Sequence, residues 1–347
     1  MRSFASINRR GLSRLLGAGV VAFGLASVAM PASAADGKYA IGFTVYGMSG
    51  WVSSGYEGVK KVAAANNVDL HWASADNSVA KQVSQVRQFI AQHVNAIIID
   101  PVDSSALGPE IKEATDRGIK VFGTNVKIFK PGSEYLTSYI GPNDVLAGEN
   151  ETKAMVKALN GKGNVVILQG PLGQSAQIDR SAGIQKILKE NPGIKVLAEQ
   201  PGEWSRVKGY DITAAWLSSY GKKIDGIISQ NDDMAVGAIR ALKQRHMKIP
   251  VVGIDGIKSG LLAVKSGEEL VSNLQNAPLQ LGMALQVAVN SLKGETVPKN
   301  IAIQMPVVTK ANVGHIYDQM YTNRDKFLAG LPKLINDNLE SGKYGNQ

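Results

Sequence analysis

After residue 39, short apolar runs alternate with longer stretches that have the apolar spacing of a helix. This alternation is typical of β-α-β units, in which helices join parallel strands and cover the faces of the sheet. The first series predicts strands at residues 40–45, 69–73, 96–100 and 120–124, and helices at residues 52–66, 79–93 and 105–117. The pattern therefore predicts an α/β fold with parallel sheets.

A second series of the same kind begins after Gly141-Pro142. It predicts strands at residues 165–169, 195–199, 226–229 and 251–254, and helices at residues 143–159, 177–189, 207–220 and 234–245. Two successive series suggest two similar lobes, and each lobe is expected to bind at the carboxyl ends of its own strands. A cleft between two facing lobes follows from this arrangement.

The rest of the chain contains too much predicted structure for a simple tail. A strand is predicted at residues 270–274, a long apolar helix at 278–292 and an extended segment at 304–309, so we expect the chain to cross back between the lobes. A charged, helix-prone tail follows Ala311, and we expect it to pack on the second lobe. Residues 342–347 are expected to be loose.

Composition limits the classes of protein to which the chain can belong. Its 347 residues are 44% hydrophobic, which suits two domains of common size. The formal net charge of +9 includes four arginines in the first 34 residues, and the other basic residues form no block. Nucleic-acid binding is therefore not supported by the charge. The sequence has no cysteine, which excludes disulfides, thiolate metal sites and a cysteine nucleophile.

The first 34 residues have the pattern of an export signal. Basic residues up to Arg14 precede an apolar stretch at 15–30, and the small-residue site Ala32-Ser33-Ala34 follows. A membrane anchor is the alternative, but the apolar stretch is short and glycine-bearing. We expect a cleaved signal peptide at residues 1–34, and the Arg9-Arg10 pair leaves the Sec and twin-arginine routes both open.

Polar side chains follow several predicted strands at the point where each strand ends. Asp100 and Asn125 follow strands of the first series, and Gln230-Asn231-Asp232-Asp233 and Asp255-Gly256 follow strands of the second. In open parallel sheets, ligands bind in the crevice outside the carboxyl ends of the strands. These residues are therefore binding candidates by position alone, although Asp232 and Asp233 also suit the start of a helix.

Two tryptophans are candidates for stacking on a ligand. Trp51 and Trp204 each open a helix or loop after a strand, where a large flat indole face can contact a ligand. Trp72 lies within a strand and Trp216 lies on the apolar face of a helix, so both are expected in the core.

The sequence lacks the motifs of an enzyme. The four histidines are scattered, and none forms a pair with metal-ligand spacing. Gly161-Lys162-Gly163 and Gly170-Pro171-Leu172-Gly173 complete neither a dinucleotide fingerprint nor a P-loop. Asp232 and Asp233 are adjacent in the chain and so do not flank one bond well. We expect no enzymatic activity, no metal and no cofactor.

Five segments, taken in order, resemble the periplasmic sugar-binding proteins of ABC importers, the ribose-binding group in particular. They are residues 99–104, 199–209, 230–235, 252–256 and 308–310. The resemblance implies the class I periplasmic binding protein fold, with two Rossmann-like lobes of parallel sheets joined by a three-segment hinge. It implies an N-terminal lobe of residues 35–140 plus 277–303, a C-terminal lobe of residues 141–276 plus 304–310, and a C-terminal helical extension at residues 311–347.

Residue by residue, the resemblance also implies a set of ligand contacts. They are Ser49, Trp51, Asp100, Asn125, Trp204, Asn231, Asp255 and Gln275. By this resemblance, Val126 and Ile178 stand where the family has arginines, whereas Arg180 matches an arginine interpreted as structural. Losing two guanidinium forks makes the pocket more apolar. We therefore predict a polyol, a deoxy sugar or a differently oriented monosaccharide, and we expect an anionic sugar acid to be disfavoured.

The implied function is that of an exported solute-binding protein. It would capture a small neutral carbohydrate in the cleft and deliver it to the permease subunits of an ABC importer, and it would reside in the periplasm. A periplasmic sugar sensor for a chemotaxis or signalling receptor is the alternative. A sugar-responsive transcription regulator shares the two-lobed core but carries a helix-turn-helix at the N-terminus, where this chain has the export signal.

Overall fold

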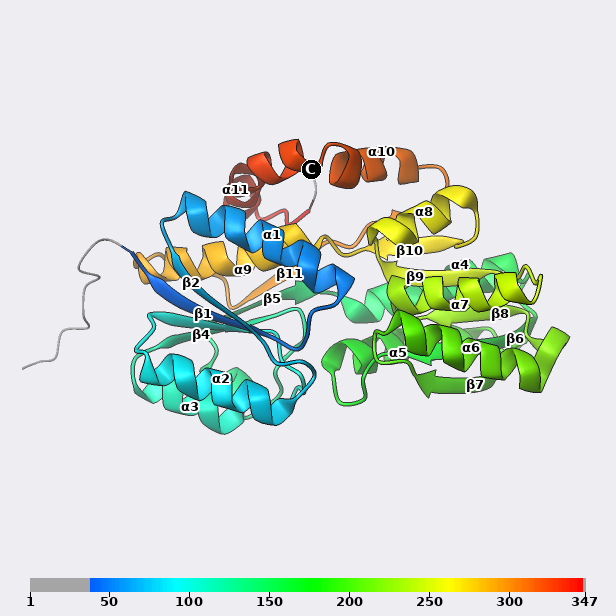
Figure 1. Cartoon of the computed structure of the whole chain (residues 1–347), viewed down its shortest axis with the longest axis horizontal. Coiled ribbons are helices and arrows are strands. Elements are labelled where there is room, and N and C mark those ends of the chain that lie inside the picture. Colours follow the sequence, from blue (N-terminus) through cyan, green and yellow to red (C-terminus); the bar gives the residue numbers. More distant parts are fainter. Residues whose placement is uncertain (1–37, 346–347) are drawn as a thin grey trace, which may run out of the picture. The chain divides into compact units, whose positions relative to one another are not determined.

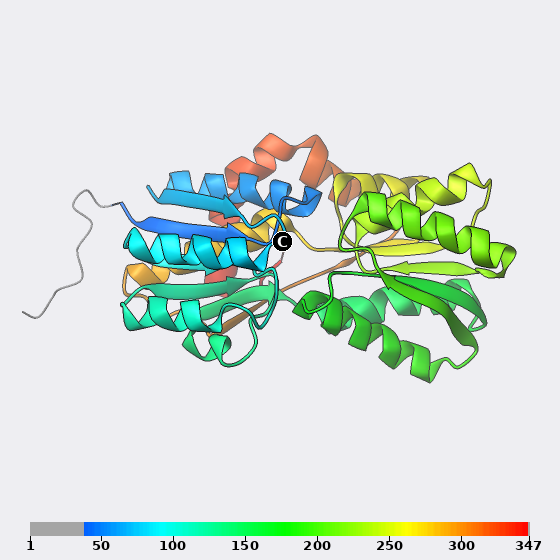
Figure 2. The ribbon, with the colours of Figure 1, turned by 60° about the horizontal axis from the view of Figure 1, so that its bottom comes forward.

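The structure of the chain is a computed structural model, and it describes residues 38–345. The predicted signal peptide lies outside the described residues. Two six-stranded sheets make up the frame, and helices cover both faces of each sheet (Figures 1 and 2). The predicted fold class, an α/β protein with two lobes of mostly parallel strands, is confirmed.

The first sheet has the strand order β11-β5-β4-β3-β1-β2, and every neighbouring pair is parallel. Its strands are β1 (Ala40–Val45), β2 (Asp69–Ser74), β3 (Ala96–Ile99), β4 (Lys120–Thr124), β5 (Ser138–Pro142) and β11 (Asn300–Ile303). Helices α1 (Gly50–Ala65) and α9 (Ala277–Leu292) cover one face, and helices α2 (Val79–Ala91) and α3 (Gly108–Asp116) cover the other. Alternate residues of β3 point to opposite faces, so Ile98 joins the core of α1 and α9 while Ile97 joins that of α2 and α3.

The second sheet has the strand order β12-β10-β9-β8-β6-β7. Its strands are β6 (Gly163–Gln169), β7 (Ile194–Pro201), β8 (Gly226–Ser229), β9 (Val251–Asp255), β10 (Val271–Leu274) and β12 (Val307–Val308). Only the short edge strand β12 is antiparallel to its neighbour. The helices of this half are α4 (Asp144–Ala158), α5 (Ser175–Glu190), α6 (Arg206–Tyr220), α7 (Asp232–Gln244) and α8 (Lys258–Ser266).

The chain passes between the two sheets three times. It crosses after β5, again between β10 and α9, and finally between β11 and β12. Helix α9 is buried on nearly every side because it lies between the first sheet, α1 and the C-terminal helix α11 (Arg324–Ser341). This position explains its continuous apolar sequence, since a helix that is hydrophobic all round is a buried one.

Three elements were not predicted from the sequence. Strand β5 reads Ser-Tyr-Ile-Gly-Pro and has no apolar run, and β11 is a four-residue edge strand whose residues alternate between exposed and buried. Helix α8 is nine residues long and follows directly on the Asp255-Gly256 turn. Short elements at edges and after turns carry too few residues to show a period.

The C-terminal tail differs from the expectation in two ways. Helix α10 (Val313–Tyr317) packs on α8 of the second half as expected, but the longer α11 packs on α1 and α9 of the first half (Figure 1). The buried stripe Phe327, Leu328, Leu331 and Ile335 explains the contact, because the uncovered faces of α1 and α9 receive it. The end is also held rather than loose, since Asn338 Nδ2 donates to the carbonyl of Gly345 at 2.7 Å. Residues 346–347 lie outside the described residues.

Within residues 38–345, no helix is both long and apolar enough to cross a membrane.

Candidate functional site

A small pocket of about 20 Å³ lies where segments at the carboxyl ends of both sheets meet. It is lined by Tyr46, Trp51, Asn125, Val126, Gln174, Ala176, Arg180, Trp204, Asn231, Asp255 and Gln275. A volume of this size has room for little more than one water molecule, so the lining side chains lie close together in this arrangement. The position agrees with the general place of ligand sites in open parallel sheets.

Six of the eight residues singled out from the sequence line this pocket. They are Trp51, Asn125, Trp204, Asn231, Asp255 and Gln275. The other two, Ser49 and Asp100, lie directly behind the wall. Ser49 Oγ accepts from the amide of Val52 at the start of α1 and lies 3.1 Å from the hydroxyl of Tyr46. Asp100 is fully buried and accepts from Asn125 Nδ2 at 3.1 and 3.3 Å.

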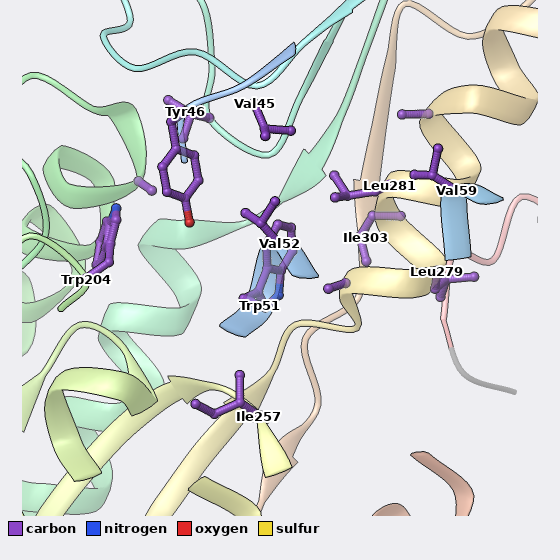
Figure 3. Close-up of a cluster of buried hydrophobic side chains, with 14 of the residues drawn as sticks. Val45, Tyr46, Trp51, Val52, Val59, Trp204, Ile257, Leu279, Leu281 and Ile303 are labelled. Carbon is purple, nitrogen blue, oxygen red and sulfur yellow. The ribbon is translucent and has the colours of Figure 1, made fainter. Parts of the chain in front are cut away.

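Three aromatic side chains from separate segments form part of the wall, and Figure 3 shows Tyr46, Trp51 and Trp204 with the hydroxyl of Tyr46 directed between the two indoles. Trp51 Nε1 donates to the carbonyl of Gln275 at 2.8 Å, and Trp204 Nε1 donates to Gln174 Oε1 at 2.7 Å. Both indole donors are therefore used by the protein. What remains for a ligand is the flat apolar surface of each ring.

Arg180 lines the pocket, although the sequence interpretation treated it as structural. The side chain is 3% exposed, and its Nε donates to Asp144 Oδ1 at 2.8 Å. Its Nη2 donates to Gln275 Oε1 at 2.9 Å, and its Nη1 lies 3.9 Å from Asp255 Oδ1. Ile178, the position taken to have lost an arginine of the family, is instead 42% exposed and does not line the pocket. Val126 does line the pocket, and Arg180 supplies a guanidinium that the sequence interpretation did not place there.

The charges in this region are nearly balanced by the protein itself. The guanidinium of Arg180 is matched by the carboxylate of Asp144 and lies close to that of Asp255. Burial raises the pKa of Asp255 well above its usual range, while Arg180 acts in the opposite direction. Burial also raises the pKa of Asp100, and the hydrogen bond from Asn125 opposes that rise. Among the described lining residues no cation stays unpaired, so the pocket favours a neutral ligand even though an arginine is present.

Gln275 connects polar groups of the pocket across the two halves. Gln275 Nε2 donates to Asn125 Oδ1 at 2.8 Å, while Gln275 Oε1 accepts from Arg180. Asn231 Oδ1 caps helix α7 by accepting from the amide of Met234 at 3.0 Å. Its Nδ2 donates to no acceptor in the described part of the protein and is therefore a donor left for a ligand.

The lining residues missed by the sequence analysis are Tyr46, Gln174, Ala176 and Arg180. Tyr46 directly follows β1, and Gln174 lies between β6 and α5, so the strand-end rule applied to every strand would have found both. Arg180 lies within α5, more than one turn from its start, and therefore does not follow the end of a strand. Its role depends on the packing of α5 and could not be found from strand ends.

The described part of the chain holds no group of three or more histidine, aspartate or glutamate side chains arranged to bind a metal.

Comparison with known proteins agrees with the geometry. Residues 41–296 match the family described as the periplasmic binding protein domain. The chain is 42% identical over 333 residues to the xylitol-binding protein of Mycolicibacterium smegmatis, covering 95% of each chain. It is 33% identical over 286 residues to the galactofuranose-binding protein of Escherichia coli, covering 80% of this chain and 89% of that protein.

A solved structure of a solute-binding protein is also similar to this chain. The ABC transporter solute-binding protein of Bacillus halodurans with bound myo-inositol superposes with a TM-score of 0.77 and 30% identity, covering 81% of this chain and 97% of that one. These relatives are binding proteins, which confirms the expectation that the chain is not an enzyme. The chain therefore belongs to the periplasmic binding protein family, as one of its sugar- and polyol-binding members.

Proposed function

We propose that the protein captures a small neutral polyol, with a monosaccharide of similar size as the second choice, and delivers it to an ABC importer. The observation that carries this proposal is the pocket that combines two indole faces with a charge-balanced polar network. Its ligand would lie among Trp51, Asn125, Trp204, Asn231, Asp255 and Gln275, with Ser49 and Asp100 supporting from behind.

Hydroxyl groups suit this wall because each can both donate and accept a hydrogen bond. Asp255 provides an acceptor, Asn231 Nδ2 provides a donor, and a bond to a charged partner is worth about 1.5 to 3 kcal/mol. The indoles of Trp51 and Trp204 would pack on the C–H surface of the ligand. A sugar acid would bring a negative charge to a site whose one guanidinium is already paired with Asp144.

The choice of a polyol rests on the relative that is named as a polyol binder. The xylitol-binding protein of Mycolicibacterium smegmatis matches this chain over nearly its whole length. A flexible linear polyol can also adapt its hydroxyls to Arg180 and Asp255 without the fixed geometry of a pyranose. Xylitol is therefore the first compound to test.

The protein would act after export, and its partner would be the permease of the importer. The family is one of periplasmic proteins, and residues 1–34 would supply the cleavable Sec or twin-arginine signal. The lobes that present themselves to the permease would be residues 35–140 with 277–303 and residues 141–276 with 304–310. Residues 311–347 would form an extension to this pair.

A thermal-shift screen of the protein without residues 1–34 tests the proposal. A ligand that binds only the folded state raises the unfolding temperature, and 100 times the Kd stabilises by about 2.7 kcal/mol. Xylitol is expected to give a clear rise, other neutral polyols and monosaccharides graded rises, and sugar acids none. Asn231→Ala should abolish most of the rise, whereas Gln88→Ala on the exposed side of α2 should keep it. A flat response to every neutral polyol and sugar would refute the proposal.

A further inference from the structure

The C-terminal segment beyond the family match contacts both halves of the protein next to the pocket. After α10, the chain makes a π-helical turn at Asp318–Thr322 before α11 begins at Arg324. π-helical turns are rare and occur frequently at functional sites. We call residues 318–324 the C-terminal strap, because one end is hydrogen-bonded to the second half and the other end to the first.

On the second half, the strap reaches the turn that carries the pocket carboxylate. The hydroxyl of Tyr321 donates to the carbonyl of Gly256 at 2.9 Å. Gly256 has a φ of 68°, and Asp255 beside it has a φ of 125°, a conformation that a residue with a side chain rarely adopts. Such a backbone persists only where its surroundings hold it. Tyr321 is one of the groups that hold this turn.

The same turn is fixed from inside the second half. Buried Asp232 accepts from the amide of Ile257 at 3.0 Å and from the hydroxyl of Ser272 at 2.7 Å. The amide of Gly256 in turn donates to Ser272 Oγ at 3.1 Å. The hydrogen bond from Tyr321 therefore adds to the bonds that Asp232 and Ser272 make within the second half. It is the one of these contacts that comes from the C-terminal strap.

On the first half, the strap is bound to the helix that opens with a pocket tryptophan. Arg324 Nε donates to Glu57 Oε2 at 2.7 Å, and its Nη2 donates to Ser54 Oγ at 3.0 Å. Ser54 and Glu57 lie on α1, whose second residue is Trp51. Arg324 Nη1 also donates to the carbonyl of Met320 at 3.2 Å, which connects this anchor to the π-helical turn.

We propose that Tyr321 and Arg324 are positioning residues, and that the strap between them holds the Asp255 turn and α1 at the separation that polyol binding requires. This proposal deepens the proposed function, and its binding measurements depend on that function being correct. Because the two anchors lie on opposite halves, a hinge motion that opens the pocket must break one anchor or deform the strap. The strap thereby limits opening and fixes the carboxylate that meets the ligand.

Two variants cut the strap with little other change. Tyr321→Phe removes only the hydroxyl that bonds Gly256, and Arg324→Gln removes the fork that bonds Ser54 and Glu57. Tyr317→Phe is the matched control. It removes a hydroxyl from the preceding turn, and that hydroxyl has no hydrogen bond to any of the described residues.

The opening of the ligand-free protein is measured first. The chain has no cysteine, so spin labels can be attached to Gln88→Cys in α2 and Gln185→Cys in α5, which are both exposed. Double electron–electron resonance then measures the distance between the two labels, one on each half. Cutting either anchor is expected to broaden the distribution toward longer distances. Cutting both should add little to cutting one, because the anchors act in series. The control should keep the wild-type distribution.

Binding of xylitol is measured second, by titration calorimetry. Each single variant is expected to raise the Kd about three- to tenfold, the effect of losing one hydrogen bond, while its thermal unfolding without xylitol stays near wild type. Unchanged distances in both variants would overturn the proposal, as would equal changes in Tyr317→Phe. If the wild-type protein binds neither xylitol nor another neutral polyol or sugar, the proposed function fails, and the distance measurement still decides the role of the strap.

Discussion

At the scale of single residues, Asp255 concentrates several unusual properties in one position. It ends a buried strand, lines the pocket, has a φ of 125° and lies 3.9 Å from Arg180. Its carboxylate makes no hydrogen bond to a side chain of the described residues, so both oxygens stay available. A carboxylate that lines the pocket from a strained backbone, with Arg180 as its charged neighbour, is placed where the proposed ligand would contact it.

Replacing Asp255 with asparagine tests this role. The shape is kept, but the charged acceptor is lost, so the Kd for xylitol is expected to rise about 10- to 150-fold. The unfolding temperature of the ligand-free protein should stay near that of the wild type. Titration calorimetry gives the Kd and scanning calorimetry the stability. Wild-type affinity in this variant would remove Asp255 from the binding site.

Glu269 is a buried acid whose effect belongs to stability rather than to binding. It is 1% exposed, and no donor among the described residues reaches either carboxylate oxygen unless Asp232 or Glu269 itself carries the proton between them. Burial and the neighbouring Asp232 raise its pKa well above the usual value of 4.5, and burial raises the pKa of Asp232 to about 7. The folded protein therefore holds these protons more tightly than the unfolded chain, and its stability falls as the pH rises above about 4.5.

The substitution Glu269→Gln removes this penalty. The free energy of unfolding is expected to increase by about 1 to 3 kcal/mol at pH 8, and the gain should vanish toward pH 4, where the carboxyl is protonated in both states. Urea denaturation at several pH values measures it. Glu268→Gln, next in the chain and paired with Lys243, should show almost no change. A gain that is independent of pH would contradict the assignment to a buried charge.

At the scale of elements, the pocket depends on the close packing of α1 against α9. Helix α1 carries Trp51, and α9 follows directly on Gln275 and Asn276. Gly58 makes the approach possible, since a Cβ there would fall 2.6 Å from the Cα of Pro278 and would also collide with its carbonyl. Backbone atoms cannot yield as a flexible side chain can, so this glycine is required by the helix contact.

Gly58→Ala is expected to lower the free energy of unfolding by about 1 to 3 kcal/mol, because it overpacks a helix contact with no room to relax. Gly330→Ala on α11 is the matched control. No atom lies within 4 Å of its Cβ position, so it should instead stabilise by about 0.5 to 1 kcal/mol through helix propensity. Urea denaturation of both variants gives the two signs. Equal effects would show that the α1–α9 contact tolerates a side chain.

The same elements show how far the sequence predicts this molecule. Strands such as β1, β4 and β8 were predicted with their observed bounds, because a buried parallel strand is a continuous apolar run between turns. Strand β5 and the edge strand β11 were not predicted, because they lack such runs. Six of the eight site residues predicted from the sequence line the pocket. The position of Arg180 in the pocket wall and the packing of α11 on the first half depend on contacts between segments far apart in the sequence. No local sequence pattern contains that information.

At the scale of the whole molecule, binding depends on contacts between the halves as well as on contacts with the ligand. Loops after β3 and β6 meet directly, since the amide of Ser175 donates to Ser104 Oγ at 2.9 Å and Gln174 Nε2 donates to the carbonyl of Val102 at 3.1 Å. Gln174 also accepts from the indole of Trp204, so this contact continues into the pocket wall. Every such bond stabilises the closed arrangement and thereby lowers the apparent Kd of a ligand that binds only there.

Lys127, in the loop after β4, and Asp179, on α5, form an ion pair between the halves, with Nζ and Oδ2 2.6 Å apart. Lys127→Glu turns this attraction into repulsion across the closing surface, so the Kd for xylitol is expected to rise about three- to tenfold, and more at low salt. The exchange Lys127→Glu with Asp179→Lys restores opposite charges and should recover most of the affinity, as titration calorimetry can show. The same exchange at Lys112 and Asp116, within α3, changes no contact between the halves and should leave binding as it is. If the double exchange binds as weakly as Lys127→Glu alone, the pair does not contribute to closure.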